Sequence, residues 1–226
     1  MNEKDVRWNE YLRLGSPYRP AIPEVALIRE YFQLVSDIYG MYLAITTSLE
    51  FLVVRIREQQ VQNTTDNNTT IEELDKLFLS VELSNCNDPN RLCSRPIPTY
   101  MCSQGGFKEK NALGGFNQRM VGNMCLVLIY QYWDDHYRKK IAEYAKREKD
   151  DIKLDIMGDL RILRHSIVHN KGVLSDRKGF CKILKWYSAG DEISMDLGQF
   201  EELIHHVELG LSKLSQDIED NVLGGV

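Results

Sequence analysis

The sequence predicts an all-α fold: a single helical domain over residues 1–226, built as an up-and-down helical bundle with a small β-hairpin before the last helix. Three observations lead to this prediction. Four long stretches repeat apolar side chains at steps of three and four residues, which is the period of a helix with one buried face. Strand-like patterning is confined to one short segment. Hydrophobic residues make up 43% of the 226 positions, enough to bury a core.

The first predicted helix covers residues 23–60, with Pro23 in the first turn, where proline is tolerated. The polar segment VQNTTDNNTT at 61–70 is predicted to be a linker, because its composition gives it no reason to pack. The apolar positions that define the helix are Val25, Ile28, Phe32, Val35, Tyr39, Tyr42, Leu49, Val53 and Ile56.

A short second helix is predicted at 71–82, where Thr70 and Glu73 have the spacing of a capping box. Residues 84–111 are predicted to be an irregular loop or insertion, because prolines, glycines and asparagines interrupt any period. Three cysteines fall in this segment without the close pairs of a zinc site, so we predict no metal there. They are Cys86, Cys93 and Cys102.

Three more helices are predicted at 112–147, 151–169 and 197–221 from the same apolar spacing. Between the last two, the segment GFCKILKWYSAGDEISMD at 179–196 is predicted to form two short strands. The turn would lie at Ala189-Gly190-Asp191, which has the composition of a hairpin turn.

Charge is distributed unevenly along the chain, although the net charge is only −5. Residues 138–185 contain 14 Lys and Arg against 7 Asp and Glu, a net charge of +7. Residues 1–137 carry −4 and residues 186–226 carry −8. A basic third of an otherwise acidic chain indicates an anionic ligand, with a charge-balanced helical surface as the alternative.

The location predicted from the sequence is cytoplasmic. The N-terminal segment MNEKDVRWNEYLRL is charged and lacks the apolar core of a secretion signal. No run approaches 18 uncharged apolar residues, so we expect no membrane association. Five cysteines without an export signal favour reduced thiols.

Candidate functional residues cluster in RILRHSIVHNKG, residues 161–172. On a helical wheel centred on Ile156, the apolar positions form a narrow stripe near 0°, because successive residues advance by about 100°. Four basic side chains fall at about 80°, 140°, 180° and 220° on the same wheel, so we expect them on the face opposite the core. In that order they are Arg164, Arg161, His165 and His169.

The end of this helix is predicted from Asn170-Lys171-Gly172, because glycine readily adopts the left-handed conformation that terminates a helix. His169 would then lie on the last turn, where the helix dipole favours a protonated imidazole. Histidine transfers protons near neutral pH, and arginine donates two hydrogen bonds to a phosphate. This combination is suited to cleaving phosphodiesters without a metal.

The segment from Arg164 to His169 resembles the Arg-polar-x₃-His signature of the HEPN superfamily, a family of helical-bundle proteins that includes metal-independent ribonucleases. The resemblance extends over the helical region 112–221 and loosely from residue 23. The sequence departs from the usual pattern at His165, where asparagine is commonest in the family.

The resemblance implies an endoribonuclease that leaves a 2′,3′-cyclic phosphate and uses neither metal nor cofactor. Arg164, His165 and His169 are then the catalytic residues, and Arg161, Asn170 and Lys171 bind RNA. It also implies a homodimer in which two motifs line one cleft. Toxin and phage-defence effector are among the roles of such enzymes, and an antidote or regulatory protein is a further expected partner.

Two alternatives remain open at this stage. His165 and His169 have the four-residue spacing of a zinc-binding pair, but Ser166 stands where a metal hydrolase would carry its general base. A non-catalytic dimeric HEPN-like module could instead use the basic face to hold a nucleotide, RNA or a protein partner. An enzyme needs an imidazole that titrates, whereas a binding module needs only positive charge.

Overall fold

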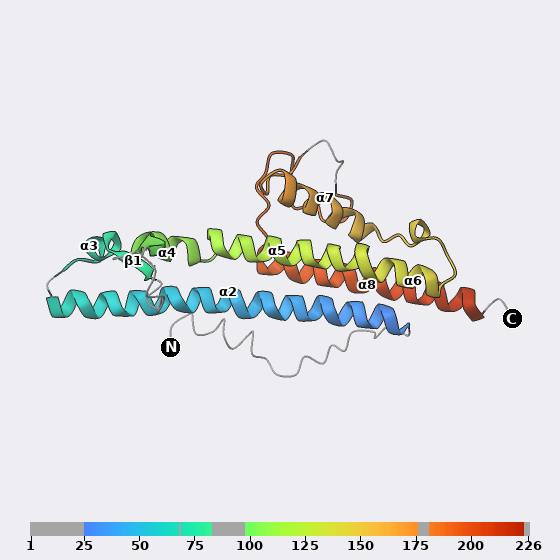
Figure 1. The fold of residues 1–226 in the computed structure, drawn as a ribbon, viewed down its shortest axis with the longest axis horizontal. Helices are drawn as coiled ribbons and strands as arrows, with labels where there is room; N and C mark the ends of the chain where they lie inside the picture. Colours follow the sequence, from blue (N-terminus) through green and yellow to red (C-terminus); the bar gives the residue numbers. More distant parts are fainter. Residues whose placement is uncertain (1–24, 68, 83–97, 176–180, 224–226) are drawn as a thin grey trace, which may run out of the picture.

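The computed structural model describes residues 25–67, 69–82, 98–175 and 181–223, and it confirms the predicted fold class (Figure 1). The long helices run in alternating directions and form an up-and-down bundle. A π-helical turn at Trp133–Tyr137 joins two of them into one continuous rod. These helices are α2 (Ala26–Asn67), α5 (Phe116–Tyr132), α6 (Arg138–Tyr144), α7 (Asp155–His169) and α8 (Leu197–Leu223).

The core lies where the faces of these helices meet, and aromatic side chains are at its centre. The ring of Tyr31 in α2 lies 5.4 Å from that of Trp133 and 5.0 Å from that of Tyr137. The Tyr31 hydroxyl donates to the carbonyl oxygen of Ile129 over 3.0 Å, so burial leaves this hydroxyl satisfied. The largest fully buried side chains include Trp133, Tyr31, Phe200, Ile28, Leu126, Ile141, Ile156, Leu160 and Leu163.

The π turn explains a spacing visible in the sequence. Residues four apart in an α-helix are displaced by about 40° around the axis, so a strict four-residue repeat soon leaves the core face. The rod nevertheless buries five such residues, because the Arg138 N–H donates to the Trp133 carbonyl and widens one turn. The five buried residues are Cys125, Ile129, Trp133, Tyr137 and Ile141.

The predicted helix 112–147 is shorter than expected, because its N-terminal residues form a separate turn. Gly114 has a φ of +70°, and a side chain at Gly115 would meet the Glu109 carbonyl oxygen at 2.5 Å. The helical rod therefore begins at Phe116, and it ends at Tyr144, before Lys146 with a φ of +52°.

The predicted linker at 61–70 is wrong for residues 61–67, which continue α2. The Thr64 and Thr65 hydroxyls donate to the Val61 carbonyl oxygen, so their polar groups are satisfied within the helix. α2 is also the one helix among the described residues that is long and apolar enough to cross a membrane. A core helix meets the same criteria of length and composition.

The predicted second helix ends early, but its start is confirmed. The Thr70 hydroxyl accepts from the Glu73 N–H, and the Glu73 carboxylate accepts from the Thr70 N–H. Helix α3 (Ile71–Lys76) follows this capping box, and strand β1 (Phe78–Glu82) begins where helix was expected.

The predicted irregular segment 84–111 is wrong for residues 98–111. They form strand β2 (Pro98–Ser103), antiparallel to β1, and helix α4 (Gln104–Asn111). The Ser103 hydroxyl caps α4 by accepting from the Gly106 N–H. Cys102 is buried, whereas Pro23, Cys86 and Cys93 lie outside the described residues.

The segment before α8 differs from the hairpin expected at 179–196. Within residues 181–196 no regular strand forms, and Glu192 makes an isolated antiparallel bridge to Val173, just after α7. The turn near Gly190 is present, with a φ of +93°. The strand expected on its N-terminal side does not form, because the buried Asp159 carboxylate accepts the N–H groups of residues 182–184.

A cluster of polar side chains joins α3 and α4 to the C-terminal part of α2. The Lys108 ammonium lies 2.7 Å from the Asp75 carboxylate and donates to the Gln60 carbonyl over 2.9 Å. The Gln60 amide, itself buried, donates to Asp75 and to Gln104. These bonds connect three helices, and the main hydrophobic cluster contains no side chain of α3 or α4 among the described residues.

We predict that Lys108→Met lowers the free energy of unfolding by about 1–3 kcal/mol, because Asp75 and Gln60 lose a partner in a largely enclosed site. Lys108 is the main cause of the lowered pKa of Asp75, so the full decrease in the free energy of unfolding should be seen at neutral pH, where the carboxylate is ionised. It should shrink as the pH falls through this lowered pKa, below the usual 3.8. Urea denaturation measures it, and equal losses from the exposed Lys110→Met would contradict the prediction.

Candidate functional site

The motif residues lie on the last turns of α7, the end of which agrees with the sequence prediction. α7 ends at His169, and Gly172 has a left-handed φ of +82°. The Gly172 and Asn170 N–H groups both donate to the Ser166 carbonyl oxygen, over 3.1 and 2.9 Å. The terminal turn is therefore held by the backbone, with Lys171 exposed beside it and Asn170 half-buried.

The core-facing side of α7 is the predicted one. Ile156, Leu160 and Leu163 are buried, and Ile167 packs at the edge of the core. Two polar residues on this side were not predicted, Asp159 and Ser166, which are 1% and 0% exposed. Both satisfy backbone groups of the segment that follows α7, so their burial is structural.

The four basic side chains do not share one outward face. Arg161 and His169 are exposed and His165 is half-buried, but Arg164 turns toward α5. Its guanidinium donates to the Gln131 side-chain oxygen over 2.9 Å and lies 5.8 Å from the centre of the Tyr130 ring. At about 80° from the centre of the apolar stripe, Arg164 stands where α7 meets α5 rather than opposite the core.

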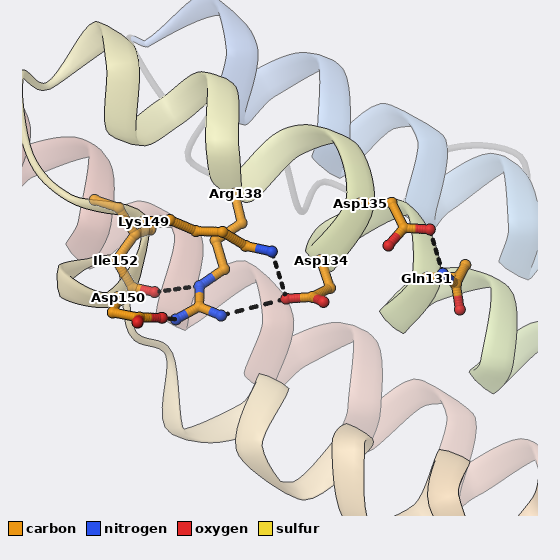
Figure 2. A network of polar contacts seen from close by, with 7 residues as sticks. All are labelled: Gln131, Asp134, Asp135, Arg138, Lys149, Asp150 and Ile152. Carbon is orange, nitrogen blue, oxygen red and sulfur yellow. Dashed lines mark hydrogen bonds and ion pairs between the residues drawn. The ribbon is translucent and has the colours of Figure 1, made fainter.

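Gln131 links Arg164 to the π turn. Its amide nitrogen donates to the Asp135 carboxylate, one helical turn along the rod (Figure 2). Its side-chain oxygen accepts from Arg164. The same stretch of the rod carries a second network centred on Arg138. This guanidinium contacts the carboxylates of Asp134 and Asp150, each at 3.3 Å, and donates to the Ile152 carbonyl.

Charged side chains of both signs surround Tyr130. Burial raises the pKa of its hydroxyl, and the nearby Asp134 raises it further, whereas three arginines oppose this shift. They are Arg161 and Arg164 from α7 and Arg138 from α6. Beside them, Arg161, Ile162, Arg164 and His165 line a shallow hollow of about 230 Å³. An anion in this hollow would meet Arg161 and Arg164, whereas Arg138 is already paired with Asp134 and Asp150.

The two histidines of the motif are adjacent. The ring centres of His165 and His169 are 4.7 Å apart and their planes are inclined by 44°. Within the described ranges, no group of three or more His, Cys, Asp or Glu side chains is arranged to hold a metal ion. Adjacent imidazoles of this kind could exchange protons with the same ligand.

Sequence reasoning missed Tyr130, Gln131 and Asp135. Gln131 and Asp135 are four residues apart, a spacing that indicates a helical pair but not a contact with another helix. Comparison with family models, with curated proteins and with solved structures finds no match to this chain.

We predict an energetic coupling between Gln131 and Arg164. Gln131→Leu and Arg164→Leu should each destabilise the fold, and the double variant should lose less than the sum, by about 0.5–3 kcal/mol, since one interaction is removed in both. Urea denaturation of the four proteins gives the cycle.

The exposed Arg161→Leu, combined with Gln131→Leu, is the matched control and should be additive within about 0.5 kcal/mol. If the losses of stability from Gln131→Leu and Arg164→Leu also add up in the double variant, the hydrogen bond does not couple the two helices and the prediction is contradicted.

Proposed function

We propose that the protein is a metal-independent endoribonuclease of the HEPN type. The observation that supports this best is the exposed imidazole of His169 on the last turn of α7, beside His165 and just over one turn beyond Arg164. Two adjacent imidazoles, one exposed and one half-buried, beside a fixed guanidinium combine proton transfer with stabilisation of charge on a phosphate.

In the proposed reaction, a ribose 2′-hydroxyl attacks the adjacent phosphorus and the 5′-oxygen leaves, which yields a 2′,3′-cyclic phosphate. His169 transfers a proton at the 2′-hydroxyl or at the leaving oxygen, and His165 orients or assists it. Arg164 stabilises the charge that develops on the phosphate oxygens. Arg161, Asn170 and Lys171 would hold the RNA backbone on either side.

The contacts of Arg164 refine this assignment. Gln131 and the Tyr130 ring hold the guanidinium in one orientation, which lowers the entropy cost of donating to a phosphate. Its Nε is buried without a hydrogen-bond partner among the described residues. A phosphate oxygen would satisfy this donor once the side chain turned toward the hollow, because the Nε is out of contact with solvent here.

We also propose a homodimer for this activity. The motif lies on the outer side of α7 beside a shallow hollow, which by itself encloses little of an RNA strand. A second copy facing α7 would turn two open sites into one cleft and bring the two His169 side chains close to each other.

A non-catalytic binding module is the second candidate. The half-buried position of Arg164 favours it, because contacts inside the chain already occupy part of the guanidinium. In this case the exposed Arg161 and Lys171 would hold an anionic partner, and His169 would contribute charge only.

We predict that His169→Ala leaves the free energy of unfolding within about 0.5 kcal/mol of the wild type, because the side chain is exposed. RNA cleavage in EDTA should nevertheless fall by about 10²–10⁴-fold, the usual cost of losing a general acid–base group. Arg164→Lys should keep only part of the activity, because lysine lacks the planar donor pair. Cleavage is followed by gel electrophoresis, with detection of the cyclic phosphate end.

The control for this experiment is His205→Ala, which removes another exposed imidazole far along the chain. All variants are purified in parallel to control for contaminating nuclease. Equal cleavage by the wild type and His169→Ala, or no cleavage of any RNA, would favour the binding module. Loss of wild-type activity in EDTA would favour zinc.

We predict a steep salt dependence of RNA binding. Each phosphate of a single strand neutralised by the basic segment should contribute about −0.7 to the slope of log affinity against log salt. Arg161→Ala should make the slope shallower by about that amount. Fluorescence anisotropy between low and physiological salt measures it, and affinity that does not change with salt would point to a protein or a neutral ligand.

A further inference from the structure

The outer face of α2 is apolar over five helical turns. Between residues 38 and 54 the only Asp, Glu, Lys or Arg is Glu50, and its carboxylate accepts from Gln118 toward the inside of the molecule. Only 22% of the membrane-like stretch of this helix is buried. Exposed apolar side chains on it include Met41, Phe51, Leu52 and Val54, with exposures of 40–55%.

Apolar surface of this extent on a helix is normally covered by a partner. The centre of the face is set by residues that advance in steps of three and four along α2. Asp37 and Arg55 stand at its two ends, and Gly40, Met41, Ala44, Ser48, Phe51 and Leu52 lie between them. On a wheel, all eight fall within about 120°, opposite the buried Tyr42, Val53 and Gln60.

The face is complementary to itself in the antiparallel direction. If two copies pair so that Asp37 of one lies opposite Arg55 of the other, the two-fold axis forms that pair twice. The same register sets Met41 opposite Phe51, Ala44 opposite Ser48, and Gly40 opposite Leu52. Leucine then packs against glycine, and phenylalanine packs against the flexible methionine side chain. A parallel pairing would instead bring like charges together.

Space is available for this approach. A side chain added at Gly40 would meet nothing within 4 Å in the described part of the chain. Asp37 and Arg55 are both exposed, and within the described part of the chain each contacts a neighbour on its own helix: Asp37 accepts from Gln33 over 2.9 Å and Arg55 lies 3.1 Å from Glu58. Such exposed pairs are weak and exchange easily for contacts with a partner.

We infer that α2 is a self-association surface, on which a second copy of this chain packs antiparallel with Asp37 opposite Arg55. α2 lies across the bundle from α7 (Figure 1), so this contact is separate from the motif and does not depend on the proposed ribonuclease activity. If copies also pair over α7, two different two-fold contacts build a tetramer.

Charge reversal tests the pairing. Asp37→Arg and Arg55→Asp should each halve the molar mass measured by light scattering at micromolar concentration, because each creates two repulsive pairs per interface. The dissociation constant should rise by about tenfold or more. The double variant Asp37→Arg/Arg55→Asp restores both pairs and should recover the wild-type mass.

Lys139→Asp on α6 is the matched control, since Lys139 is also exposed and also lies beside a glutamate of its own helix. It should leave the mass unchanged, and circular dichroism should show all variants folded. A monomeric wild type, no recovery in the double variant, or the same effect from Lys139→Asp would overturn the inference. So would a monomer that binds phosphatidylcholine vesicles, because lipid would then cover the face.

Discussion

The arrangement around α7 depends on one buried carboxylate. A charged group that leaves water must be fully hydrogen-bonded, and Asp159 meets this requirement by accepting three consecutive N–H groups over 2.7–2.8 Å. The chain after α7 is thereby tied back to the side of the helix that faces the core. The opposite side is left open, and it is on this side that Arg161, His165 and His169 lie.

The parts of the fold that the sequence predicts are those governed by local rules. The capping box at Thr70, the end of α7 near Gly172 and the apolar faces of the long helices each depend on a few neighbouring residues. The failures involve contacts across the chain. Polar composition at 61–67 does not prevent helix when threonine hydroxyls bond to the preceding turn, and strand β2 depends on a partner some twenty residues away. The strand expected at 182–184 does not form, because the Asp159 carboxylate already accepts the backbone N–H groups that would pair with a neighbouring strand.

The candidate site shows the same division. The wheel correctly identifies the buried stripe and the exposure of Arg161 and His169, because these follow from position on one helix. It misplaces Arg164, since a residue at the edge of the stripe is directed by the neighbouring helix, and here α5 offers both an acceptor and an aromatic face. Arginine in such a place is anchored as well as charged, so its structural and chemical contributions are inseparable in any single substitution.

The π turn lets the α5–α6 rod hold one residue more than an ordinary α-helix of the same length. Its five residues turn through nearly the same angle as four residues of an α-helix, so the extra residue is absorbed within one turn. Removing Asp135 or His136, both exposed, should let an ordinary α-helix form while the later side chains keep their directions. Ile141 would stay in the core and Arg138 would keep its contacts with Asp134 and Asp150. In related sequences a gap of one residue should therefore be tolerated in this stretch, whereas a gap elsewhere in the rod would turn every later side chain by about 100°.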